Sequence, residues 1–213
     1  DSLDMVGEWY FRPGSVLSLG AFAKFIKDPI FEQEDVLTDV DFGGRNYQRL
    51  EVSQMQNGNK ADIIGLEAML RSQFTFLDGF WSGFGVSLNA TVLDGKLDTP
   101  NRGSVDFPEQ SKLLWGAQLF YQRGPVEASV GYHHTGQALI GISGSELTDE
   151  YNDDFRRLDA KIAFDITPNA RIFFEGQNLT DEATRQYQGG NEDWVIQRER
   201  YGRVFWGGAS LRF

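Results

Sequence analysis

The sequence contains no cysteine, little proline, only two histidines and no long apolar run. The absence of cysteine from its 213 residues excludes disulfide bonds, thiol catalysis and zinc–thiolate sites. No stretch reaches the length of an apolar transmembrane helix. Acidic residues outnumber basic ones by 31 to 20, for a net charge of −11, so the basic surface that a nucleic-acid partner needs is lacking. The chain is instead rich in glycine (24) and phenylalanine (17).

The last eleven residues, 203–213, form the clearest β-strand pattern. Hydrophobic or small residues at 205, 207, 209, 211 and 213 alternate with Trp206, Gly208, Ser210 and Arg212. A period of two with one apolar face predicts a strand. Soluble proteins rarely end on an exposed aromatic strand, whereas an outer-membrane β-barrel can turn such a face to lipid.

Eight further segments alternate in the same way, and no segment has a helical period. They are residues 3–11, 17–25, 64–70, 84–92, 113–121, 126–132, 158–164 and 172–176. Alternation alone fits either a β-sandwich or a wide barrel, because both place one face of each strand against apolar surroundings.

The connections between the segments favour the barrel. Short links at 12–15, 77–79, 123–125 and 167–169 contain the Pro and Gly residues that reverse a chain quickly. Long polar links at 36–45, 94–111, 136–154 and 179–202 alternate with them. Short periplasmic turns, long extracellular loops and aromatic residues crowded beside the turns are typical of outer-membrane barrels. Residues 45–56 have strand character, and we expect them to continue the barrel wall above the membrane.

Several motifs resemble the C-terminal barrel of TonB-dependent outer-membrane receptors. The run at 175–182, with Asn-Leu-Thr-Asp at its centre, resembles the end of an outward strand of that family. Tyr201-Gly202-Arg203, followed by Gly208 and Phe213, resembles the last strand. Residues 8–15, 25–30, 64–67 and 83–91 match the family in the expected order. Trp206 departs from the pattern, since the assembly signal usually has a polar residue there.

The resemblance implies an all-β fold, an antiparallel transmembrane β-barrel. Residues 1–213 would form about nine C-terminal strands of a barrel of roughly 22 strands, without the plug domain. Because strand character begins at Leu3, we expect the chain to be part of a longer protein, with any signal peptide outside it.

The resemblance also implies a function: TonB-dependent import of a scarce nutrient such as an iron–siderophore, a cofactor chelate or an oligosaccharide. The implied location is the outer membrane of a Gram-negative bacterium. The implied partners are TonB and the inner-membrane energising complex (through an N-terminal part outside this chain), the plug domain, outer-membrane lipid, and a small-molecule substrate. The C-terminal strand ending at Phe213 looks like the signal that the barrel-assembly machinery reads. The alternatives are a passive porin-like channel and a soluble carbohydrate-binding β-sandwich.

Substrate contacts are expected in the loop at 181–200, from Tyr187, Trp194, Arg198 and Arg200. Aromatic faces stack on sugar rings or flat chelates, and arginines hold carboxylates or phosphates with two hydrogen bonds. The alternative is that these side chains pack the loops together.

No catalytic group, metal site or cofactor is expected. His133 and His134 are adjacent, so they face opposite sides of a strand and cannot hold one metal ion together. No persuasive Ser-His-Asp context surrounds them, which argues against an enzyme. The acidic run at 149–154 has enough oxygen for calcium, but a solvated loop is the favoured interpretation. We expect the polar-face charges to neutralise one another across neighbouring strands: Glu67, Arg71, Arg157, Asp159, Lys161, Arg171 and Glu175.

Overall fold

A computed structural model describes residues 1–212, which form two β-sheets and two short 3₁₀ helices. The strands are β1 (Ser2–Arg12), β2 (Ser15–Lys27), β3 (Ile30–Phe42), β4 (Arg45–Asn57), β5 (Lys60–Gln73), β6 (Phe84–Thr99), β7 (Gly103–Asp106), β8 (Leu113–Arg123), β9 (Val126–Thr135), β10 (Ala138–Ser143), β11 (Glu150–Asn152), β12 (Phe155–Thr167), β13 (Ala170–Gln177), β14 (Thr184–Gln188), β15 (Asn191–Glu199) and β16 (Val204–Leu211). The 3₁₀ helices are η1 (Gly79–Gly83) and η2 (Glu146–Thr148). Among the described residues, no helix is long and apolar enough to span a membrane.

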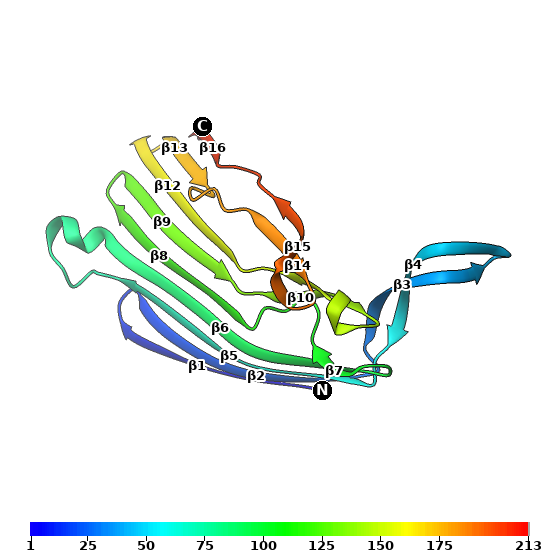
Figure 1. The fold of residues 1–213 in the computed structure, drawn as a ribbon. Helices are drawn as coiled ribbons and strands as arrows, with labels where there is room; N and C mark the ends of the chain where they lie inside the picture. The colour runs from blue at the N-terminus through cyan, green and yellow to red at the C-terminus, as the bar shows by residue number, and fades with distance from the viewer. Residues whose placement is uncertain (213) are drawn as a thin grey trace.

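Nine strands form a wall in the order β1-β2-β5-β6-β8-β9-β12-β13-β16, each antiparallel to its neighbours, and β7 pairs with β6 beside them. These are the nine segments that the sequence predicts, in the predicted order, which confirms the antiparallel β fold. Figure 1 shows the wall as a curved, tilted sheet with short connections at one end and long connections at the other. We call these ends the turn end and the loop end.

One face of the wall is apolar and exposed. Every second position on successive strands holds an apolar or small residue, and large exposed side chains among them include Leu66, Leu119 and Phe174. The opposite face carries the charges. A continuous exposed apolar face of this size is unusual in water, but it is what a strand needs where it faces lipid.

The hydrophobic core lies at the loop end, away from the middle of the wall. Phe31, Ala61, Leu97, Leu139 and Ile142 form one buried cluster, and Val105, Phe107 and Tyr151 pack against it. These residues come from both sheets. The core therefore joins the wall to the loops that stand on it.

Three of the four predicted tight turns are present: β1 to β2, β8 to β9, and β12 to β13 each reverse across two residues. The prediction of a tight turn at 77–79 was wrong, because the link between β5 and β6 spans residues 74–83 and contains η1. Its aromatic rings pack on the neighbouring strands and fix the longer path: Phe80 lies 5.0 Å from Tyr121 and 5.3 Å from Phe84 between ring centroids.

The predicted polar link at 36–45 was also wrong. β3 and β4 form a long hairpin across it, and Gly43 and Gly44 take positive φ angles of 59° and 78° at its two-residue turn. Positive φ at both central residues suits the twist of a hairpin, and glycine adopts it without a steric cost. β4 does not continue the wall either. The hairpin projects from the loop end in Figure 1 and belongs to the second sheet.

Candidate ligand-binding loops

Three long connections pair with one another to form a six-stranded sheet at the loop end, in the order β15-β14-β11-β10-β3-β4. We call it the loop sheet. Its hairpins are antiparallel, and one parallel pair, β10 with β3, joins the β3–β4 hairpin to the rest. The predicted polar links at 94–111, 136–154 and 179–202 thus hold strands β7, β10, β11, β14 and β15 in addition to the ends of wall strands. A surface of this kind can present side chains in a fixed arrangement.

A buried ion pair fixes the loop sheet to the wall. Arg102, in the β6–β7 turn, donates hydrogen bonds of 2.5 and 2.8 Å from its two terminal nitrogens to the carboxylate of Asp149. Asp149 is 2 % exposed and also accepts from the backbone N–H of Ser143 at 2.9 Å. The hydrogen bond to Asp149 is the main cause of a raised pKa at Arg102, although burial acts in the opposite direction. The opposite charges of Arg102 and Asp149 and the two hydrogen bonds between them together offset the cost of burying both groups.

A second ion pair joins β14 to the end of β11. Arg185 Nε donates to Asp153 at 2.5 Å, and this pair raises the pKa of Arg185. Gln137 donates to Glu192 at 2.7 Å on the adjacent hairpin. The loops between β9 and β12 and between β13 and β16 are therefore held together by charge and hydrogen bonds.

Tyr187 lies inside the loop sheet. Its side chain is 2 % exposed, and its ring stacks on Tyr151 with centroids 5.3 Å apart and planes 8° from parallel. Burial, aided by nearby carboxylates including Asp153, raises the pKa of Tyr187 to about 12. In this arrangement the ring packs β14 against β11.

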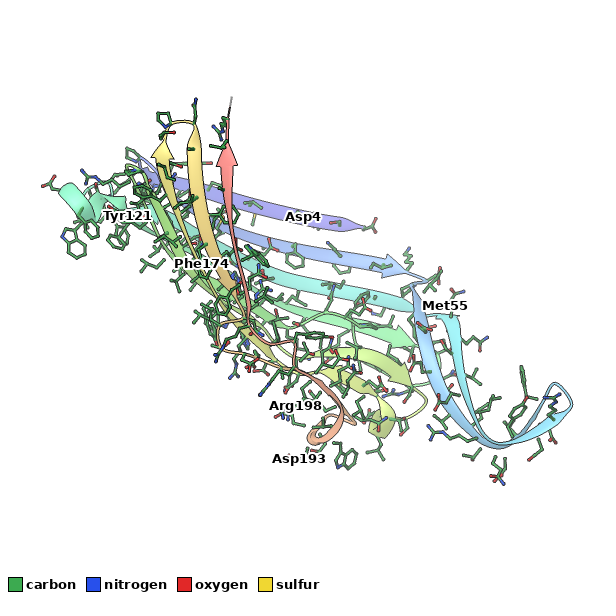
Figure 2. The ribbon with its side chains drawn as sticks, turned by 90° about the horizontal axis from the view of Figure 1, so that it is seen from above. Asp4, Met55, Tyr121, Phe174, Asp193 and Arg198 are labelled. Carbon is green, nitrogen blue, oxygen red and sulfur yellow. The ribbon has the colours of Figure 1, made fainter. Side chains whose placement is uncertain are left out.

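Trp194, Arg198 and Arg200 lie on or next to the exposed strand β15. Trp194 is 50 % exposed, and its ring covers Gly189, where an added Cβ would be 2.9 Å from the indole. Arg198 is exposed, and Figure 2 shows it near Asp193 on the β14–β15 hairpin. Arg200 lies 3.8 Å from the Asp181 carboxylate. Trp194 and Arg198 thus lie exposed on β15, while Tyr187, on β14 of the same hairpin, is buried.

The structure also contains a cleft that the sequence interpretation missed. It has a volume of about 610 Å³ and lies between the β3–β4 hairpin and strands β10 and β11. Glu34, Glu51 and Glu150 line it, together with Arg49, which pairs with Glu51 at 2.7 Å. Burial and the charge of Glu34 raise the pKa of Glu150. No local sequence pattern predicts the cleft, because it exists only through the pairing of β3 with β10.

The acidic run at 149–154 is paired with arginines. Asp149 binds Arg102, Asp153 binds Arg185, and Asp154 lies 2.5 Å from Arg156. Within residues 1–212, no group of three or more metal-ligating side chains is found. The favoured interpretation of this run as a solvated loop was wrong for Asp149 and Asp153, whose carboxylates are largely buried by these contacts.

The predicted polar-face charges that form cross-strand ion pairs do so with Glu127 and Asp165 rather than with one another. Arg157 Nε lies 2.9 Å from Asp159 on the same strand, and Lys161 lies 3.9 Å from Glu127 on the neighbouring strand. Arg171 on β13 reaches past β12 to pair with Glu127 on β9. The two histidines face opposite sides of the sheet. The His134 ring lies beside Trp115 on one face, with the ring centroids 5.8 Å apart, and the His133 ring lies over Gly116 on the other face.

The Asn-Leu-Thr-Asp run has a structural role. Asn178 takes a positive φ of 51°, and its side chain binds three backbone groups: it donates to the carbonyls of Glu182 and Gly202 at 3.0 and 3.1 Å and accepts from the N–H of Glu182 at 2.9 Å. The motif therefore fixes both ends of the loop that carries β14 and β15.

Comparisons with known proteins agree with this architecture. A family model described as "TonB dependent receptor-like, beta-barrel" matches residues 3–179. A search of curated proteins gave no significant match. Similar solved structures include the ferric-catecholate import receptor Fiu from K12 E. coli (TM-score 0.66, 16 % identity) and the copper transporter OprC (TM-score 0.67, 16 % identity). A variant of the ferric enterobactin receptor PfeA from Pseudomonas aeruginosa is also similar (TM-score 0.63, 16 % identity).

Each of these three likenesses covers 100 % of this chain but only 27 %, 31 % and 31 % of Fiu, OprC and PfeA, respectively. The chain therefore spans about a third or less of their length. At this identity the likeness shows the shared fold alone. The family match covers most of the chain, and the chain accordingly belongs to the TonB-dependent receptor-like β-barrel family.

Proposed function

We propose that this chain is part of an outer-membrane receptor that imports a scarce nutrient in a TonB-dependent manner, and that it is not an enzyme. In this proposal residues 1–213 supply nine C-terminal strands of a larger barrel, and the plug domain and the TonB contact belong to the rest of the receptor. The signal for the barrel-assembly machinery at Phe213 lies outside the described residues and stays a prediction.

The observation that carries the proposal is the loop sheet. A ligand receptor needs exposed side chains held in a fixed arrangement over a membrane-spanning wall. Two ion pairs and a hydrophobic cluster hold the loop sheet in that way. If the loop end is extracellular, as the alternation of short turns and long loops favours, this sheet meets a ligand first.

We propose a metal chelate as the substrate class. The similar proteins are named as receptors for ferric catecholates, ferric enterobactin or siderophores, and one is named as a copper transporter. A planar chelate with anionic groups suits Trp194 as a stacking surface and Arg198 as a bidentate partner. Tyr187, buried beneath them, would act by positioning the hairpin.

Ligand binding by the full-length receptor tests these contacts. We expect Trp194→Ala and Arg198→Ala each to weaken binding of a ferric siderophore panel by roughly tenfold, as the loss of one stacked ring or one charged hydrogen bond predicts. Trp81→Ala is the matched control, because Trp81 is exposed at the turn end and is expected to leave affinity unchanged. Equal affinity for all variants would remove the β15 hairpin from the binding site.

Uptake in cells tests the energy coupling. We expect accumulation of the labelled chelate to stop when the proton gradient is collapsed or TonB is deleted. Uptake that continues under both conditions would favour a passive porin-like channel instead.

A further inference from the structure

The apolar outer face of the wall contains one recessed groove. It crosses strands β6, β8, β9, β12, β13 and β16, from Phe84 and Tyr121 near the turn end to Leu179 and Phe205 toward the loop end, and has a volume of about 370 Å³. Ala128, Ala160 and Gly176 form its floor. Larger side chains surround the floor: Phe84, Leu119, Tyr121, Ile162, Phe174 and Phe205. Figure 2 labels two of these, Tyr121 near the turn end and Phe174 on β13.

Strand register explains the recess. Ala128 pairs with Tyr121 on one side and Ile162 on the other, and Ala160 pairs with Gly176. Small residues on three successive strands thus interrupt two cross-strand rows of larger ones. A Cβ on Gly176 would lie 3.0 Å from the Phe205 ring, so the glycine leaves room for that ring to form one side of the groove.

A cation lies where the groove approaches the turn end. Arg123 is two residues beyond Tyr121 on the same face of β8, and its guanidinium donates to Ser82 Oγ at 2.8 Å. Two strand residues span roughly 7 Å. The rings of Phe80, Phe84 and Tyr121 cluster beside it, as aromatic residues do at a membrane interface.

An apolar groove that leads to an exposed arginine at the interface matches the shape and charge of a phospholipid. The acyl chain requires an apolar channel without polar atoms, and the phosphate requires a charged donor at head-group depth. We propose that this groove binds one phospholipid of the inner leaflet, with an acyl chain over Ala128 and Ala160 and its phosphate at Arg123. The proposal rests on the outer-membrane location and the periplasmic position of the turn end, but not on any substrate.

Native mass spectrometry of the full-length receptor, extracted from outer membranes in mild detergent, tests this site. We expect the receptor to retain one phospholipid and to bind added phosphatidylethanolamine saturably with one high-affinity site. Ala160→Phe fills the floor and is expected to lower occupancy by about tenfold or more. Arg123→Gln removes the phosphate contact and is expected to weaken binding by roughly tenfold.

Ala68→Phe is the matched control, because Ala68 lies on the same apolar face of the sheet, on β5, is exposed and does not line the groove. Its occupancy is expected to equal that of the unmodified receptor. Heat-modifiable migration in gels confirms that each variant is folded, and Ala128→Leu replaces Ala160→Phe if the latter does not fold. Absence of a retained lipid, equal occupancy in Ala160→Phe and Ala68→Phe, or a retained lipid A in place of a phospholipid would each overturn the proposal. Chelate uptake, measured in the same variants, separates this result from failure of the transport function.

Discussion

Replacing Asp149 by asparagine is expected to loosen the loop sheet while leaving the wall intact. Asp149 is 2 % exposed and accepts two hydrogen bonds from Arg102 and two from Ser143, one from its backbone N–H and a longer one from its hydroxyl. Asn has the same size and can still accept from Ser143, but the Arg102 charge, whose side chain is only 11 % exposed, loses its partner. Breaking a buried ion pair in this way costs about 3–5 kcal/mol. We take about 3 kcal/mol, because Arg102 retains some access to water.

Hydrogen exchange measures this cost locally. A loss of about 3 kcal/mol corresponds to roughly hundredfold faster exchange of amides that open with the sheet. Peptides covering β10 to β11 and the amide of Gly189, which donates to the Asp149 carbonyl at 2.8 Å, report it in the full-length receptor. Wall peptides are expected to keep their rates.

Glu51→Gln is the control, because it breaks an ion pair with Arg49 whose two side chains are 66 % and 73 % exposed. Exposed pairs contribute about 0–1 kcal/mol, so its exchange is expected to change by a few-fold at most. The double replacement Arg102→Met with Asp149→Leu leaves no buried charge and is expected to recover much of the protection. Exchange in Asp149→Asn no faster than in Glu51→Gln would refute the reasoning.

Three other perturbations have defined outcomes. Between pH 10 and about 12, Tyr187 keeps its proton in the folded chain but releases it in the unfolded chain, so the free energy of unfolding falls as pH rises. Denaturant titrations at increasing pH are expected to show this fall in the unmodified protein and not in Tyr187→Phe. Gly85→Ala places a Cβ against the Phe120 ring and is expected to cost about 2–3 kcal/mol in thermal unfolding, whereas Gly7→Ala, with nothing within 4 Å, is expected to be near neutral. Asn178→Ala deletes three hydrogen bonds at a residue with positive φ and is expected to destabilise the loop at 181–202 by about 2–4 kcal/mol. Limited proteolysis of that loop is expected to become faster, and an unchanged cleavage rate would contradict the role of the motif.

The wall could be predicted from sequence because each of its strands has lipid on one side. Apolar residues must then recur with a period of two, whatever the neighbouring strand contains. The short turns carry their own signals in residues such as Pro13 and Gly124. The turn at 77–79 was predicted wrongly because the longer link depends on packing of Phe80 against Tyr121 of β8, which the local sequence does not indicate.

The loop sheet could not be predicted in the same way. Strands such as β3 and β4 are polar on much of both faces, so their sequences show little alternation. Their pairing depends on partners far away in the chain, as with Gln33 and Ile142. The candidate binding residues were chosen by chemistry alone, and sequence cannot distinguish Trp194, half exposed, from Tyr187, buried behind it. The position of the Asp149 carboxylate beside Arg102 likewise exists only in the folded chain.

The pairing of β3 with β10 also sets an order of assembly. Each hairpin of the loop sheet closes locally, but this parallel pair joins only Gln33 to Ile142 and Glu34 to Ser143. Contacts between distant parts of a chain form late, since loop closure costs entropy before any contact repays it. This pair is therefore expected to form after the hairpins on its two sides have closed. As the shortest junction in the loop sheet, it is also where that sheet would separate first under mechanical load.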